Sequence, residues 1–390
     1  MKYIYLDNAA TTPVDEQVTK VMIPYFSEKY GNASSQHTLG LEAKRALEQS
    51  RDVIAKSIGA KSDEIIFTSG GTEANNFAIK GIVWELAKAG KKHIIISKIE
   101  HDCVLNSCKW LEKHVPGLKV TYLNIDPEGF INLEDLKKAI TSETAIISVI
   151  HGNNEIGTIQ DIGAIGRICR EKGILFHTDA CQSYTKTELN VKKQNLDLVT
   201  LNAHKIHGPK GVGALYIREG VKITPLMHGG GHERGLRSGT ENVAGIFGFA
   251  QAVKLAKTKH IEHMEKLRNK LIEGILKVEN TNLNGASCES NKRLCNNINI
   301  RFNDIEGEAL GGYLDAYGIQ SSTGSACSSH SLEPSHVLRA LGLSDLEANS
   351  SIRLSLSRFS TEEEIEKTIE IVRKVVTKLR KISPFSNLNK

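Results

Sequence analysis

A lysine close to two histidines follows a short apolar run in the middle of the chain. Lys205 comes directly after His204 and two residues before His207, and the apolar run 198–201 precedes all three. A lysine at the end of a buried strand carries a desolvation cost unless its amine is hydrogen-bonded or uncharged. Such an amine can form a Schiff base with a carbonyl compound. Lys205 is therefore the first candidate for covalent chemistry.

Polar residues follow three other strand candidates. Asp179 follows the run 174–177, and a buried carboxylate there needs a partner because an unpaired one is costly. His101 comes shortly after another run, although a lone histidine is more often structural than catalytic. The segment 70–72, Gly-Gly-Thr, links a strand candidate to a helix candidate, and the N–H groups of a helix start favour an anion. On its own, this segment is better explained as an ordinary turn with a threonine cap.

These features together match the requirements of one cofactor. Pyridoxal phosphate needs a lysine for a Schiff base, an acid at its pyridine nitrogen, an anion site for its phosphate and an aromatic ring against its face. The sequence offers Lys205, Asp179, the helix start at 70–72 and His101 for these four tasks. Each residue alone is weak support, but their joint occurrence predicts a pyridoxal-phosphate site.

The segments that must position these residues alternate between short apolar runs and stretches of helical period. The runs are β-branched and apolar on both faces, as buried parallel strands are. This alternation predicts an α/β fold with a mostly parallel sheet flanked by helices, in which ligands bind beyond the carboxyl ends of the strands. The expected strands are 65–68, 93–96, 120–123, 145–149, 174–177, 198–201 and 213–217, and the expected helices between them include 72–88 and 162–172, the latter capped by Gly173.

The pattern changes after about residue 220 and predicts a smaller α+β domain that the N-terminal segment joins. We expect residues 15–258 to form the large cofactor-binding domain, and residues 1–14 with 259–390 to form the small domain. Within the second half we expect one long helical segment at 242–278, an antiparallel strand at 297–302 and helices at 306–317 and 361–382.

Composition excludes several classes of protein. Of 390 residues, 40% are hydrophobic and 24% are charged, which is ordinary for a globular protein, and no run of about 18 apolar residues predicts a membrane span. The N-terminus reaches Asp7 before a signal-peptide apolar region can form, so we expect a cytoplasmic protein. A net charge of +5 without a basic tail argues against nucleic-acid binding. Seven cysteines without a CxxC pair indicate neither a zinc site nor a disulfide framework, and we expect six of them to be small core residues.

Motifs along nearly the whole chain resemble the NifS/IscS-type cysteine desulfurases, which belong to the class-V aminotransferases and to fold type I of the pyridoxal-phosphate enzymes. The resemblance implies that fold, a homodimer, L-cysteine as substrate and an iron–sulfur scaffold protein or another sulfur acceptor as partner. The motifs are YLDNAATTP at 5–13, TSGGTE at 68–73, EH at 100–101, NNEIG at 153–157, DACQ at 179–182, HK at 204–205, GLRSGT at 235–240, GSAC at 324–327 and IRLS at 352–355.

The resemblance also implies a role for individual residues. Lys205 would bond the cofactor and move the substrate Cα proton, Asp179 would hold the pyridine nitrogen, and His101 would stack on the ring and act as an acid or base. Gln182 would contact the ring hydroxyl oxygen, while Asn154 and Arg353 would bind the substrate carboxylate, Arg353 in a bidentate pair. The residues implied for the phosphate are Gly71, Thr72, His204, Thr240 from the other subunit, and Asn202, which stands where the family commonly has serine.

Cys327 is the expected nucleophile, because the group that takes sulfur from the substrate must both reach it and carry it away. It lies in a small, polar stretch, 321–331, which predicts an exposed loop. The plainer explanation is a surface loop with an incidental cysteine, and Cys181 beside Asp179 is the nearest rival. Sequence also leaves open a selenocysteine lyase, another fold-type I enzyme, or a non-catalytic assembly subunit, although an intact Lys205 argues against the last.

Overall fold

The computed structural model describes residues 3–323 and 333–383, so Cys327 lies outside the described residues. The chain forms a seven-stranded sheet of order β2-β8-β7-β6-β5-β3-β4, in which only β8 runs antiparallel to its neighbours. The mostly parallel sheet and all seven expected strands are confirmed. The strands are β2 (Ile65–Thr68), β3 (His93–Ser97), β4 (Lys119–Leu123), β5 (Thr144–Ser148), β6 (Leu175–Asp179), β7 (Leu198–Asn202) and β8 (Gly213–Ile217).

Helices cover both faces of this sheet because alternate residues of each strand face opposite sides. In β2, Ile65 and Phe67 join one hydrophobic core, whereas Ile66 joins another on the opposite face. The first core includes residues of α1 (Glu16–Met22), α3 (Thr38–Ser57), α7 (Ile162–Lys172) and α8 (Val243–Leu255). The second includes residues of α4 (Gly71–Leu86) and α5 (Asp102–His114). The two remaining helices of this half are α2 (Pro24–Ser27) and α6 (Leu133–Ala139).

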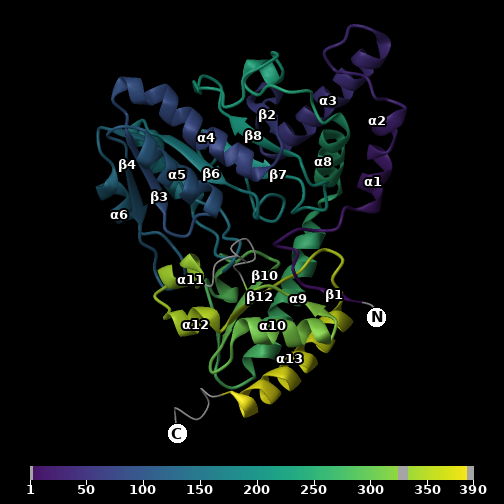
Figure 1. Ribbon diagram of the computed structural model, residues 1–390, viewed down its shortest axis with the longest axis vertical. Coiled ribbons are helices and arrows are strands. Elements are labelled where there is room, and N and C mark those ends of the chain that lie inside the picture. Colours follow the sequence, from purple (N-terminus) through teal and green to yellow (C-terminus); the bar gives the residue numbers. More distant parts are fainter. Residues whose placement is uncertain (1–2, 324–332, 384–390) are drawn as a thin grey trace.

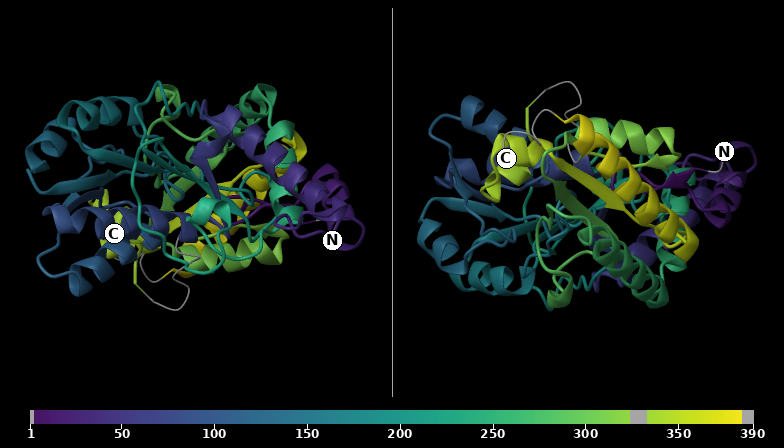
Figure 2. Two further views of the ribbon diagram at one scale, coloured as in Figure 1. Left: turned by 90° about the horizontal axis from the view of Figure 1, so that it is seen from above. Right: turned by 90° about the horizontal axis from the view of Figure 1, so that it is seen from below.

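The second half of the chain builds a smaller unit with its own core (Figure 1). Its three-stranded antiparallel sheet has the order β12-β10-β9, and β1 of the N-terminal segment pairs with β11 beside it. Seen from below, α13 runs alongside the strands of this sheet (Figure 2). Its elements are β1 (Ile4–Tyr5), α9 (Thr258–Leu276), β9 (Thr281–Leu283), β10 (Asn297–Phe302), α10 (Gly307–Ala316), β11 (Ile319–Gln320), α11 (His336–Ala340), α12 (Asp345–Asn349), β12 (Ser351–Ser355) and α13 (Glu362–Ile382).

The separate cores and the β1–β11 pairing support a large and a small domain, although the exact boundaries stay a prediction. The expectation of one helical segment over 242–278 is wrong, because α8 ends at Leu255 and α9 begins at Thr258. Ala256 is extended between them, with ψ of 128°. The break lets α8 join the core of the large sheet while α9 packs on the core of the small unit. Within the described ranges, no helix combines the length and the apolar character that a membrane crossing requires.

Candidate active site

A cavity of about 470 Å³ lies beyond the carboxyl ends of the parallel strands and is lined by residues of both the large domain and the small unit. It brings together ten of the residues expected at the site. Thr240 does not line it and is exposed, so its role toward another subunit stays a prediction, and Cys327 lies outside the described residues. The ten are Gly71, Thr72, His101, Asn154, Asp179, Gln182, Asn202, His204, Lys205 and Arg353.

Lys205 lies three residues after the end of β7 and projects toward the N-terminal segment. Its Nζ donates hydrogen bonds to the carbonyl oxygens of Ala9 and Ala10, the second at 2.5 Å. The desolvation problem that the sequence raised is therefore met by backbone carbonyls. The neighbouring His204 is held neutral at pH 7, because burial and the nearby charge of Lys205 lower its pKa to about 4.

Asp179 is buried at the end of β6, and both of its carboxylate oxygens accept hydrogen bonds. Oδ1 accepts from the backbone N–H of Cys181 at 2.9 Å, and Oδ2 accepts from Nδ2 of Asn75 at 2.7 Å. The expected partner thus exists, but it is a neutral amide instead of a cation. Asn75 was missed from sequence, since it lies in a helix whose buried face was read only from its apolar residues. A carboxylate held this way is suited to bind a protonated ring nitrogen.

The start of α4 forms the anion-binding end of the cavity. Gly70 caps this helix without a side-chain hydrogen bond, so the first N–H groups of the helix have no side-chain cap. A Cβ on Gly71 would lie 2.6 Å from Cys181 Sγ, so the close approach of these two segments requires glycine. Asn202 stands beside this helix start, and its buried Oδ1 has no hydrogen-bond partner among the described residues.

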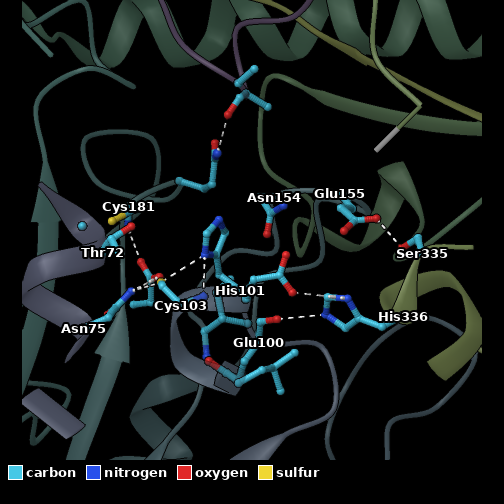
Figure 3. A pocket seen from close by; sticks show the side chains of 18 of the residues that line it. Thr72, Asn75, Glu100, His101, Cys103, Asn154, Glu155, Cys181, Ser335 and His336 are labelled. Carbon is cyan, nitrogen blue, oxygen red and sulfur yellow. Dashed lines mark hydrogen bonds and ion pairs between the residues drawn. The ribbon is translucent and has the colours of Figure 1, made fainter. Parts of the chain in front are cut away.

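His101 caps α5, and its ring lies among polar side chains that the sequence analysis did not select. Its Nδ1 lies 3.0 Å from Cys103 Sγ and accepts from Cys103 N at 3.2 Å. Cys103, Asn75 and Cys181 all lie near His101 in the close view of the cavity (Figure 3). Contrary to expectation, Cys103, Cys181 and Cys288 are only half-buried, because the first two face this cavity.

Two buried carboxylates complete one wall of the cavity and were also missed. Glu100 accepts a hydrogen bond from Ser97 Oγ at 2.5 Å, and burial raises its pKa to about 8. Glu155 accepts from Ser335 Oγ at 2.5 Å, and burial raises its pKa as well. His336 Nε2 lies 3.0 Å from the carbonyl oxygen of Glu100. These contacts join the start of α11 to the large sheet (Figure 3).

Arg353 reaches the cavity from β12 of the small unit. Its Nη2 pairs with Asp7 Oδ1 at 2.9 Å, and its Nη1 donates to the carbonyl oxygen of Asn154 at 3.0 Å. Each of these nitrogens carries a second N–H. The guanidinium is therefore fixed from two sides and still has the donors that a bidentate pair with a carboxylate requires.

Comparisons with known proteins agree on one family. Residues 4–368 match the family model described as aminotransferase class-V. The cysteine desulfurase IscS of Dictyoglomus turgidum is 50% identical over 386 residues, which cover 98% of this chain and 96% of that protein. A solved NifS-like protein is 39% identical, with a TM-score of 0.90 over 97% of this chain and 100% of its own. A structure titled SspA in complex with cysteine is 38% identical, with a TM-score of 0.82 over 92% of this chain and 100% of its own.

Proposed function

The chain belongs to the aminotransferase class-V family, and we propose that it is a cysteine desulfurase that converts L-cysteine to L-alanine. The observation that carries the proposal is the convergence on one cavity of an amine, a carboxylate with neutral partners, an uncapped helix start and a fixed guanidinium. These are Lys205, Asp179, the first turn of α4 and Arg353. The names of its relatives, IscS among them, point the same way.

The cofactor is pyridoxal phosphate, which when bound draws electrons away from the Cα of an amino-acid substrate. The cavity fits it in size and in donor set. Lys205 would hold it covalently, Asp179 would hold its ring nitrogen, and Gln182 its ring hydroxyl oxygen. Its phosphate would lie at the start of α4, near Thr72, His204 and Asn202.

The protein residues then divide the work at the substrate. Arg353 and Asn154 bind the carboxylate and so place the Cα within reach of the amine. The amine of Lys205 moves the Cα proton. Between proton transfers, the carbonyl oxygens of Ala9 and Ala10 orient this amine. The ring of His101 would cover the bound cofactor and would take part in proton exchange as an acid or base.

We assign sulfur transfer to Cys327 on the basis of the sequence alone. Its thiolate attacks the sulfur of the bound cysteine, so that a sulfur–sulfur bond forms while the carbon–sulfur bond breaks. The electron pair of the broken bond remains on carbon, which takes up a proton and leaves as alanine. Cys327 keeps the sulfur as a persulfide for an acceptor.

The proposed partners are a second copy of this chain and a sulfur acceptor such as an iron–sulfur scaffold protein. Two features support the dimer. Thr240 is exposed outside its own cavity, and the large apolar side chains of Ile23, Phe26 and Tyr30 are exposed near α2. A cytoplasmic location is supported by the cysteines, since the six in the described ranges are all free thiols.

The test is production of alanine from cysteine by the protein supplied with pyridoxal phosphate. We expect equimolar alanine and released or protein-bound sulfur from the wild type. We expect none from Lys205→Ala, while Lys210→Ala, which changes an exposed lysine five residues away, should stay active. A wild type that binds the cofactor but forms no alanine would overturn the proposal, and a strong preference for selenocysteine would favour a selenocysteine lyase.

A further inference from the structure

We infer that Cys103 is a positioning residue for His101: its thiol bonds Nδ1 beside the backbone N–H and so fixes the orientation of an imidazole that carries its proton on Nε2. The inference rests on the proposed function, because the reaction is the one that His101 would serve. Cys103 is the second residue of α5, is half-buried and lines the cavity. It makes no covalent bond in this role and touches the reaction only through His101.

The tautomer follows from the two groups that face Nδ1. The backbone N–H of Cys103 points at this atom from 3.2 Å, and an N–H can only donate. Nδ1 must therefore accept, and in a neutral imidazole the proton then lies on Nε2. Any residue other than proline at position 103 would keep this backbone bond. The Cys103 side chain adds to it when its S–H, with Sγ 3.0 Å from Nδ1, also donates to Nδ1 and so fixes the orientation of the ring.

Asn75 fixes the direction of the thiol. Its Nδ2 lies 2.7 Å from Asp179 Oδ2 and 3.1 Å from Cys103 Sγ. The Asp179 oxygen accepts this bond, so the amide turns its nitrogen to this side, and one hydrogen goes to each partner. The sulfur of Cys103 then accepts from Asn75, which leaves its own hydrogen for His101. Figure 3 labels Asn75, Cys103 and His101, which these contacts join.

This chain links the carboxylate expected to hold the cofactor ring nitrogen with the imidazole expected to cover the ring. Two neutral side chains, Asn75 and Cys103, separate Asp179 from His101, so no charge is added between them. Nδ1 is engaged by the protein, so a substrate or cofactor bound in the cavity would meet the ring at Nε2. Cys181 also lines the cavity, but its backbone N–H is engaged by Asp179 and not by His101.

The test compares Cys103→Ala with Cys103→Ser, which keeps a hydroxyl that can accept from Asn75 and donate to Nδ1. Cys108→Ala is the matched control, since Cys108 lies in the same helix and is fully buried away from the cavity. Two readouts are needed: steady-state kinetics with cysteine as a function of pH, and the ¹⁵N resonances of the His101 ring, assigned with His101→Ala and recorded with and without cofactor.

In the wild type, Nδ1 should resonate as an unprotonated nitrogen and Nε2 as a protonated one. Cys103→Ala should shift the Nδ1 resonance, lower kcat by about threefold to tenfold with little change in KM, and alter the pH profile. Cys103→Ser should restore all three, and Cys108→Ala should leave all three unchanged. A protonated Nδ1 in the wild type, or an unchanged Nδ1 resonance and pH profile in Cys103→Ala, would overturn the inference. A wild type without desulfurase activity would instead overturn the proposed function, and the ring resonances would still decide the role of Cys103.

Discussion

Replacing Arg353 by lysine tests how the cavity would recognise an amino-acid carboxylate. The guanidinium is buried, with a side-chain exposure of 4%, and its two terminal nitrogens already bond Asp7 and the carbonyl oxygen of Asn154. It can bind a substrate carboxylate as well because each terminal nitrogen has a second N–H and Nε has no hydrogen-bond partner among the described residues. A lysine has one nitrogen at the end of a flexible stem, so it cannot hold both protein partners and offer a parallel pair of bonds to the substrate.

The expected loss is one charge-assisted hydrogen bond, worth about 1.5–3 kcal/mol. At about 1.4 kcal/mol for each factor of ten, kcat/KM for cysteine should fall roughly 10- to 150-fold, mostly through KM. Asp7 also loses its bond to Arg353 in the variant, so thermal stability should fall modestly.

The assay is alanine formation across a range of cysteine concentrations, with thermal unfolding recorded beside it. Arg358→Lys is the control. Arg358 pairs with Asp15 at 2.5 Å and is nearly as buried, but it does not line the large cavity. It should lose stability and keep its KM. An unchanged KM in Arg353→Lys, or an equal rise in KM in both variants, would refute the assignment of Arg353 to the substrate carboxylate.

Three further outcomes are expected. Borohydride reduction of the cofactor-bound protein should fix the label on Lys205, and recovery of the label on Lys210 would exclude the assigned lysine. Asp179→Asn should weaken cofactor binding and reduce turnover further still, because an amide cannot accept from both Asn75 and Cys181 as the carboxylate does. A titration with pyridoxal phosphate measures the binding, and kcat measures the turnover. Unchanged turnover would mean that another acid holds the ring. Burial raises the pKa of Glu100 from 4.5 to about 8, so its neutral form is favoured in the folded protein and stability should be lost as the pH rises through that interval. In thermal unfolding, the melting temperature of Glu100→Gln should lack this loss. The same dependence of melting temperature on pH in both proteins would contradict this prediction.

The strands and most of the cavity lining could be predicted because one physical rule governs both. Buried parallel strands are apolar on both faces, so the polar residues that follow each run mark the edge where ligands bind. Asp179 and Lys205 were found in this way. The break between α8 and α9 was not, since neither glycine nor proline marks it, and it follows from the two helices packing on different cores.

Residues that act through tertiary contact could not be selected from the sequence. Asn75 is separated from Asp179 by 104 positions, and only the packing of α4 against the sheet brings them to 2.7 Å. Cys103 was grouped with the core cysteines because a free cysteine in or beside an apolar segment is usually a small core residue. Glu100 and Glu155 are buried carboxylates that bond the hydroxyl groups of Ser97 and Ser335. Only the folded structure reveals these hydrogen bonds.

The most direct test of the central claim is to ask which cysteine receives the sulfur. The protein carrying its cofactor is exposed briefly to cysteine, digested and analysed by mass spectrometry for peptides that have gained one sulfur atom. The account predicts the added sulfur on the peptide that contains Cys327, and it predicts that Cys327→Ala keeps its cofactor but releases no alanine while Cys181→Ala stays active. Added sulfur on the peptide that contains Cys181, or alanine release by Cys327→Ala at a rate close to that of the wild type, would contradict the mechanism.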